Sequence, residues 1–215
     1  MRIIVLMGPP GAGKGTVSNR VADRLGCLHI STGDLLREAI AQVTPIGVRA
    51  EVCIKRGELV PDDLIMALVE EQFDRRGDGG YLLDGFPRTL TQASLLDACL
   101  AARGTRVVAV IELAASAEVV LRRLGGRRIC ASCGAGYHSL FIPPRKPDSC
   151  DRCGGPLVQR LDDRDEAIKR RLAVYAKEMA ELRPYYEERG ILTVVEASGT
   201  PEQTAVGMLQ ALEGR

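Results

Sequence analysis

The hydrophobic positions along the chain predict strands that alternate with helices. Residues 3–7 form an unbroken aliphatic run closed by glycine and proline, which is typical of a strand buried on both faces. After the next loop, Val17, Val21 and Leu25 recur every four residues, the spacing of a helix that packs one stripe against a sheet. Strand, loop and helix make the first half of a βαβ unit. Similar short apolar strands are predicted at residues 27–30, 81–83, 107–113 and 191–195.

Five strands interleaved with helices predict an α/β fold, with a five-stranded parallel sheet flanked by helices. Helix starts are indicated at Pro61, Thr89, Ser116 and Pro201, each ahead of a helical pattern. These are the positions at which we expect helices to return the chain to the sheet.

Two stretches interrupt the alternation. Residues 31–60 are mostly helical by propensity, with breaks at Thr44–Pro45 and Gly57, and contain no obvious strand. Residues 127–160 carry four clustered cysteines and four prolines and show little helical periodicity. We therefore expect two insertions in a core made of residues 1–30, 61–126 and 161–215.

Composition and charge exclude several classes of protein. With 215 residues, 46% hydrophobic and 27% charged, the chain has the composition of a globular protein. Lys and Arg number 29 against 28 Asp and Glu, so the net charge of +1 gives no sign of a nucleic-acid or membrane partner. The run at residues 3–7 is too short for a signal peptide, and no window reaches the roughly 18 apolar residues of a membrane span. We expect a cytoplasmic protein.

A glycine-rich loop follows the first predicted strand. Residues 8–14 read GPPGAGK, which is the G-x-x-x-x-G-K pattern in the strand-to-helix context that a phosphate-binding loop requires. Its backbone N–H groups and the following helix N-terminus favour an anion, and Lys14 adds a full charge. Gly15 stands where the general pattern has Ser or Thr, and Thr16 comes next. A ligand-free turn is the alternative, but such a turn needs neither the lysine nor so many glycines.

A second motif follows the strand predicted at residues 81–83. Asp84 lies at the carboxyl end of that strand, beside the glycine-rich loop in a parallel sheet, where it can hold Mg²⁺ directly or through water. The alternative is a turn or capping aspartate. Arg88 follows the rigid Phe86–Pro87 pair and is expected in the same crevice.

Six arginines gain meaning as a set, because phosphoryl transfer gathers several phosphates and guanidinium groups stabilise the transferred charge. Singly, each is more often a solvated surface charge. The candidates are Arg37, Arg88, Arg123, Arg127, Arg160 and Arg171.

The clustered cysteines have the spacing C-x₂-C-x₁₆-C-x₂-C, formed by Cys130, Cys133, Cys150 and Cys153. Four thiolates close a tetrahedral zinc site that leaves no position for substrate, so the predicted metal is structural. Two disulfides or four free thiols are the alternatives, and a reducing compartment disfavours the disulfides. The two histidines, His29 and His138, are interpreted as packing or surface residues.

These motifs together resemble the adenylate kinase family over nearly the whole chain. The loop at residues 8–16 is similar to the family's phosphate loop, including Gly15, and residues 31–37, STGDLLR, resemble its monophosphate-binding segment. The stretch 84–88 with Gln92 resembles its most specific signature. The arginines and acids at residues 126–128 and 160–171 resemble the borders of its lid, and the cysteines resemble the zinc-bearing lid of a bacterial subset.

The resemblance implies a P-loop fold and reversible transfer of a phosphoryl group from Mg-ATP to AMP, giving two ADP. It implies a helical monophosphate-binding insertion at 31–60 and a zinc-bearing lid at 127–160, which close over the substrates. The residues implied to bind ATP are Gly11, Ala12, Gly13, Lys14, Gly15, Thr16, Arg123, Arg127, Gly136, Tyr137 and Pro201. Gly136 is a departure, since many family members have Ser or Thr there.

The residues implied to bind AMP come from the predicted insertion at 31–60 and from the segment 85–92, and Arg160 and Arg171 would clamp the reacting phosphates. They are Thr32, Arg37, Glu58, Leu59, Val60, Gly85, Phe86, Pro87, Arg88, Gln92, Arg160 and Arg171. The catalytic set is Lys14, Asp84, Arg88, Arg123, Arg127, Arg160 and Arg171. The partners are ATP, AMP and ADP, with a monomer expected and neither nucleic acid nor membrane.

Two other functions remain open at this stage. One is a kinase for UMP, CMP or GMP, since only the family resemblance of Gln92 favours adenine as the acceptor base. The other is a P-loop ATPase whose zinc ribbon binds nucleic acid. Basic residues of the cysteine segment favour this second alternative, whereas its few aromatic residues and the near-neutral chain disfavour it.

Overall fold

The computed structural model describes residues 1–56, 60–76, 79–160 and 163–213. Its central sheet is parallel, with strand order β2-β3-β1-β4-β8. The five strands are β1 (Ile3–Met7), β2 (Cys27–Ser31), β3 (Gly80–Asp84), β4 (Val107–Ala114) and β8 (Leu192–Glu196). The predicted five-stranded parallel sheet is confirmed.

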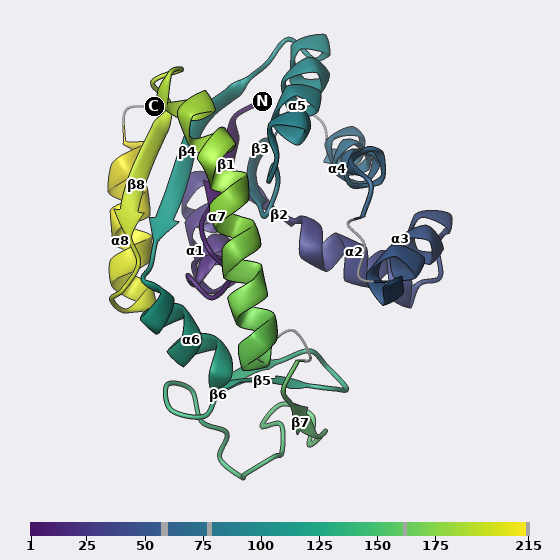
Figure 1. Cartoon of the computed structure of the whole chain (residues 1–215), viewed down its shortest axis with the longest axis vertical. Helices are drawn as coiled ribbons and strands as arrows, with labels where there is room; N and C mark the ends of the chain where they lie inside the picture. The colour runs from purple at the N-terminus through teal and green to yellow at the C-terminus, as the bar shows by residue number, and fades with distance from the viewer. Residues whose placement is uncertain (57–59, 77–78, 161–162, 214–215) are drawn as a thin grey trace.

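Helices cover both faces of this sheet (Figure 1). They are α1 (Lys14–Leu25), α4 (Asp62–Arg76), α5 (Leu90–Ala102), α7 (Asp165–Glu187) and α8 (Pro201–Leu212). The helix α6 (Ala117–Gly125) lies beyond the carboxyl end of β4 and packs against α7. The side chains of Thr89 and Ser116 accept hydrogen bonds from the first turns of α5 and α6. Thr200 and Gln203 form a capping box around Pro201 at the start of α8. The helix starts predicted from capping residues are therefore correct.

The core lies on both sides of the central strand β1. Ile3, Val5 and Met7 pack with α4, α5 and α7, while Ile4 and Leu6 face the opposite way, toward α1 and α8. Each of these five side chains is at most 4% exposed. Burying one such side chain contributes about 1.5–3 kcal/mol, which explains why an unbroken apolar run suits the middle of a two-sided sheet.

Several strands extend beyond their predicted ends. The predictions stopped at residues 30, 83 and 113, but β2, β3 and β4 continue through Ser31, Asp84 and Ala114, and the last strand covers 192–196 rather than 191–195. Ser31 and Asp84 are direct partners in the β2–β3 ladder. Apolar runs do not mark the ends of β2 and β3, because Ser31 and Asp84 are polar.

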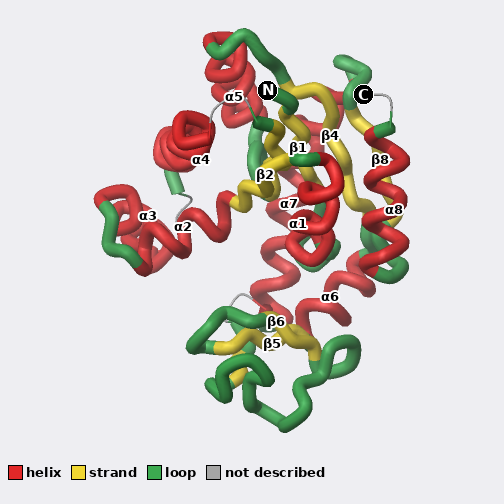
Figure 2. The backbone as a smooth tube through the Cα atoms, turned by 180° about the vertical axis from the view of Figure 1, so that it is seen from behind, coloured by secondary structure: helices red, strands yellow, loops and turns green. Residues whose placement is uncertain are grey.

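Two groups of elements project from the sheet in both views (Figures 1 and 2). The first contains α2 (Thr32–Ala41) and α3 (Pro45–Arg56), as predicted for a helical segment with a break before Pro45; Gly57 lies outside the described residues. The second is an antiparallel sheet of order β6-β5-β7, made of β5 (Arg127–Cys130), β6 (Gly136–His138) and β7 (Leu157–Val158). The sequence did not reveal these strands, which are too short for a hydrophobic period.

Among the described residues, no helix combines the length and the apolar character needed to span a bilayer.

Candidate active site

The glycine-rich loop packs tightly between β4 and α6. Gly8, Gly11 and Gly13 have φ values of 147°, 78° and 100°. A Cβ atom at Gly8 would lie 2.9 Å from the Leu113 carbonyl, and one at Gly11 would lie 2.8 Å from Leu124. Side chains are excluded there both by backbone conformation and by space. The loop can therefore curl closely around a ligand, as the sequence pattern predicts.

Lys14 starts α1 and reaches back over this loop. Its Nζ donates to the carbonyls of Gly8 (2.5 Å) and Pro9 (3.0 Å). Burial is the largest cause of a Lys14 pKa lowered to about 8; the charge of Asp84 acts in the opposite direction, and the charges of Arg88 and Arg171 act in the same direction as burial. The loop, the 84–88 segment and α7 therefore lie within electrostatic reach of one another around Lys14. Such a cluster of positive groups favours an anion.

Asp84 lies at the end of β3 beside this lysine and is 7% exposed. His29 Nε2 is 3.4 Å from its Oδ2, and His29 Nδ1 is 2.8 Å from Asn19 Oδ1. The aspartate does not cap a helix, since Thr89 caps α5. A single buried carboxylate near a phosphate loop fits Mg²⁺, which keeps waters and takes its remaining ligands from phosphates. The contact with His29 was not foreseen, because the sequence assigned that residue only to packing or surface.

Gly85 organises the segment after β3. Its carbonyl accepts hydrogen bonds from Thr32 Oγ1 (3.1 Å) and Arg88 Nε (2.8 Å). Phe86 is fully buried and precedes Pro87 through a cis peptide bond. The structure therefore brings together at one carbonyl Thr32 of α2 and Arg88, two of the residues that the resemblance implies for AMP.

Gln92 lies under this segment rather than on the surface. Its Oε1 accepts from the Arg88 backbone N–H (2.8 Å), its Nε2 donates to Asp62 Oδ1 (2.7 Å), and the residue is 4% exposed. Asp62 was not among the predicted site residues, although it begins a predicted helix. Val60 is half-buried, whereas Glu58 and Leu59 lie outside the described residues.

Arg37 forms an ion pair with Asp34 on α2. Burial tends to raise the pKa of Asp34, but hydrogen bonds from Arg37 and Ser31 hold that pKa below its usual value. The charge of Arg160 acts in the same direction, so Arg160 lies within electrostatic reach of α2. Two of the predicted phosphate-binding arginines are thus near one another.

Asp163 holds two more of the arginines. Its carboxylate is fully buried and accepts from Arg127 Nε (2.7 Å) and NH2 (2.6 Å), while Arg171 NH1 lies 3.6 Å away. A bidentate pair of this kind fixes the plane of a guanidinium group. The sequence marked this acid only as part of a lid border, although an acid flanked by arginines could have indicated an anchor.

Arg123 joins the glycine-rich loop to the segment before α8. Its NH1 donates to the Ala12 carbonyl (3.0 Å) and its NH2 to the Gly199 carbonyl (2.9 Å). Burial and then the charge of Arg122 lower its pKa. Arg123 and the Pro201 region are therefore adjacent, as the predicted donor site requires.

Tyr137 points into the antiparallel sheet and is 8% exposed, whereas Gly136 is exposed. The Tyr137 hydroxyl accepts from the Asp151 N–H (2.7 Å) and lies 3.4 Å from Cys150 Sγ. The side chain thus faces the cysteines, which leaves its backbone for any contact with a nucleotide.

His138 is buried, and its Nδ1 accepts from the N–H groups of Leu140 (3.0 Å) and Phe141 (3.2 Å), in agreement with the packing or surface role predicted for it.

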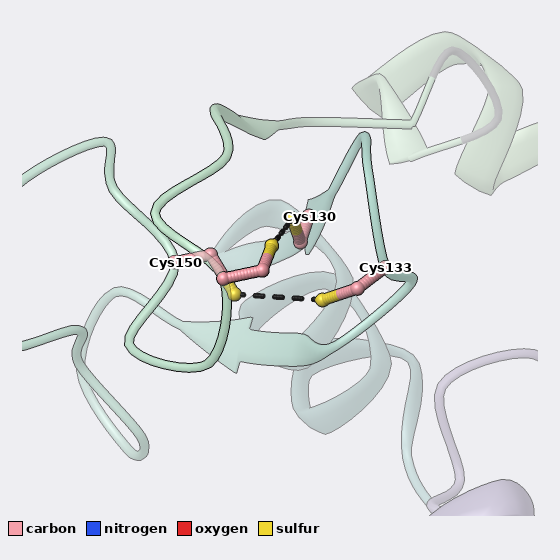
Figure 3. A group of neighbouring side chains, drawn as sticks. Cys130, Cys133 and Cys150 are labelled. Carbon is pink, nitrogen blue, oxygen red and sulfur yellow. Dashed lines mark hydrogen bonds between the residues drawn. The ribbon is translucent and has the colours of Figure 1, made fainter.

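The four cysteines meet between β5, β6 and β7 (Figure 3). Their Sγ atoms all lie within 4.8 Å of one another, with 3.4 Å between Cys130 and Cys153 and 3.6 Å between Cys133 and Cys150. Disulfides require about 2.05 Å. Zn–S bonds of about 2.3 Å place tetrahedral sulfurs roughly 3.8 Å apart. Hydrogen bonds, first that from Tyr137, lower the pKa of Cys150, whereas the pKa of Cys153 in the same cluster is raised.

The candidate site therefore has two positively charged regions, and each is suited to phosphate groups. One is the glycine-rich loop with Lys14, and the other is lined by Arg88 and the arginines of α2 and α7. An enzyme that moves a phosphoryl group between two nucleotides needs both regions, with an acid for the metal between them. This arrangement defines a P-loop phosphotransferase.

Comparison with known proteins agrees with this class and narrows it. The family model described as adenylate kinase matches residues 6–191. An adenylate kinase of Moorella thermoacetica is 50% identical over 198 residues, covering 91% of this chain and 90% of the relative. Adenylate kinases of Pelobacter propionicus and Archaeoglobus fulgidus are 45% and 43% identical, covering 98% and 91% of this chain and 96% and 90% of the relatives. The chain belongs to the adenylate kinase family, and it is a nucleoside monophosphate kinase.

Proposed function

We propose that the chain catalyses the reversible, Mg²⁺-dependent reaction ATP + AMP = 2 ADP and so balances adenine nucleotides. The observation that carries this proposal is that Lys14, held against the glycine-rich loop by the Gly8 and Pro9 carbonyls, also lies within electrostatic reach of Arg88 and Arg171. Each of these groups can stabilise charge on a phosphoryl group in transfer.

The donor site is proposed to consist of the backbone of residues 11–16 and the side chains of Lys14 and Arg123. Arg123 is held against the loop by its two carbonyl partners, so its guanidinium face is available to an adenine ring. The proposal adds Arg127 together with the backbone of Gly136, Tyr137 and the Pro201 region.

The acceptor site is proposed to be lined by Thr32, Arg37 and Arg88, with Gln92 facing the adenine base of AMP. Thr32 and Arg88 share the Gly85 carbonyl, which supports a single site between α2 and the 85–88 segment. The backbone of residues 58–60 is expected to contribute, and Arg160 and Arg171 to clamp the reacting phosphates.

The mechanism needs no covalent nucleophile, because an oxygen of the AMP phosphate attacks the terminal phosphorus of ATP. The bond from that phosphorus to the ADP leaving oxygen breaks as the new bond forms. Lys14 and the arginines position the phosphates and stabilise the charge on the transferred group. Mg²⁺, which Asp84 would hold through water, supplies further neutralisation of phosphate charge.

Water must be kept from the transferred group, or ATP would be hydrolysed. We therefore propose that residues 31–60 and 127–160 act as two covers on the core of 1–30, 61–126 and 161–215. The Arg127–Asp163 pair lies where the second cover joins α7, so closure there would also carry phosphate-binding groups.

Zn²⁺ is proposed to occupy the four-cysteine site and to stabilise the second cover rather than to take part in the reaction. Four thiolates fill its coordination sphere. Thiols that must stay reduced suit the cytoplasm, which is where we place the activity. A single chain carries all the proposed groups, so the reaction requires no second copy.

The deciding experiment is a transfer assay with ATP and each of AMP, UMP, CMP and GMP, with and without Mg²⁺. We expect ADP to form from ATP and AMP only when Mg²⁺ is present. A preference for another monophosphate would overturn the acceptor and favour the related kinase. ATP hydrolysis that needs no AMP, with salt-dependent binding of RNA or DNA, would support the nucleic-acid alternative.

A further inference from the structure

Each end of the Gln92 amide is held by a partner that has only one hydrogen-bonding role, donor at one end and acceptor at the other. The Arg88 backbone N–H can only donate, and it points at Oε1 (2.8 Å). The Asp62 carboxylate can only accept, and it receives Nε2–H (2.7 Å). A flipped amide would place oxygen against a carboxylate and N–H against N–H. Because Gln92 is 4% exposed, water offers little compensation, so the two partners define the orientation of the amide.

The orientation matters because a free amide reads two kinds of purine equally well. A 6-aminopurine offers a donor at N6 and an acceptor at N1, whereas a 6-oxopurine offers an acceptor at O6 and a donor at N1–H. An amide that can flip satisfies either pair. An amide held in one orientation satisfies only the 6-aminopurine. It would place donor against donor and acceptor against acceptor with a 6-oxopurine.

We propose that Asp62 is a specificity-determining positioning residue, which selects a 6-aminopurine acceptor by fixing the orientation of the Gln92 amide. The inference rests on the proposed function, in which Gln92 faces the acceptor base. After its two anchors are satisfied, Gln92 keeps one N–H and one lone pair, which is the complement of adenine N1 and N6. Asp62 contributes a charge-assisted hydrogen bond and therefore the stronger anchor.

The neighbouring residue supplies a matched control. Asp63 also lies in the first turn of α4, but its side chain is 70% exposed and its carboxylate is 4.0 Å from Arg49. Losing either charge has a similar effect on the helix N-terminus. Within the described part of the chain, Gln92 donates a hydrogen bond to Asp62 and none to Asp63.

The test compares Asp62→Asn, Asp63→Asn and the unchanged enzyme with AMP and with inosine monophosphate, a 6-oxopurine. An asparagine at position 62 can accept or donate, so it tolerates both amide orientations. We expect the AMP to inosine monophosphate ratio of kcat/KM to fall about tenfold in Asp62→Asn, since the Arg88 N–H anchor remains. The ratio should stay unchanged in Asp63→Asn, and the KM for ATP should stay unchanged in both.

An unchanged ratio in Asp62→Asn, or an equal fall in both variants, would overturn the inference. Asp62→Ser, whose hydroxyl also donates or accepts, answers the same question if the asparagine variant does not fold. Failure of the proposed function would look different, because the unchanged enzyme would then not prefer AMP to the other monophosphates.

Discussion

The glycine-rich loop and the four-cysteine cover are both short polar segments, yet they are stabilised in different ways. The loop follows β1, whose residues 3–7 are at most 4% exposed, and it packs on Leu113 and Leu124. The apolar cluster of the cover consists, among the described residues, of Cys130, Ala135, Tyr137, Cys150 and Leu157. Two of its five members are themselves cysteines of the four-thiol cluster, so little apolar burial is left to hold the cover.

This contrast separates chemistry from stability. In the core, a site cation such as Lys14 or Arg88 can be removed with little effect on folding, because the sheet is held by its two apolar faces. In the cover, four thiols converge beside a small apolar cluster, so a metal bound there would contribute folding free energy. Changes in the two regions should therefore affect different measurements.

The largest expected effect is on turnover, from Lys14→Ala or Arg88→Ala. Each removes a charge that stabilises the transferred phosphoryl group, so kcat should fall by about 10³-fold or more. Thermal unfolding should change little, since burial already disfavours the Lys14 charge. Steady-state kinetics and calorimetry on the same preparations test this, and a loss below about tenfold would contradict these roles.

Asp163→Asn should lower both the stability and the turnover of the enzyme. It leaves Arg127 without its buried bidentate partner and weakens the contact with Arg171. Breaking a buried ion pair costs about 3–5 kcal/mol, and misplaced guanidinium groups should also lower kcat. Urea unfolding and single-turnover rates measure the two effects, and normal values of both would show that the arginines do not depend on this anchor.

Cys130→Ser should lower the zinc content and the melting temperature, with only a secondary effect on the rate. The side chain is 1% exposed inside the cluster, so no other described group can take its place in a tetrahedral site. Cys53→Ser, outside the cluster, is the control and should leave zinc content unchanged. Metal analysis of freshly purified protein tests the prediction, and an absence of zinc in the unchanged enzyme would require another account of the cluster.

The smallest expected effect is proton uptake on ATP binding. Burial lowers the pKa of Lys14 to about 8 in the free enzyme, and a bound triphosphate raises it by stabilising the charged amine. Near pH 8 about half of the amines are neutral and take up a proton, whereas below pH 7 almost all are already charged. ATP affinity should therefore fall as the pH rises above 8. Calorimetry in two buffers of different ionisation enthalpy measures the uptake, and none near pH 8 would place the Lys14 pKa elsewhere.

Local spacing was enough to predict the glycine-rich loop, the 84–88 segment and the cysteine cluster, because the residues of each motif recur at a fixed spacing in a single stretch of the chain. Apolar periodicity likewise predicted the parallel sheet and its helices. The short strands of the cover were not predicted, since segments such as Gly136–His138 contain no repeat from which a period could be read. The polar ends at Ser31 and Asp84 were missed because strand prediction followed apolar residues.

By itself, the sequence determined the chemical groups and the order of the elements: a loop for phosphates, arginines for transferred charge and thiols for a metal. Tertiary structure alone decided which groups hold one another, as in Asp163 with Arg127, Gln92 with Asp62 and His29 with Asp84. These partners lie 36, 30 and 55 residues apart in the chain. Such pairs form because folding removes both members from water and requires each polar group to find a partner, a condition that no local pattern records.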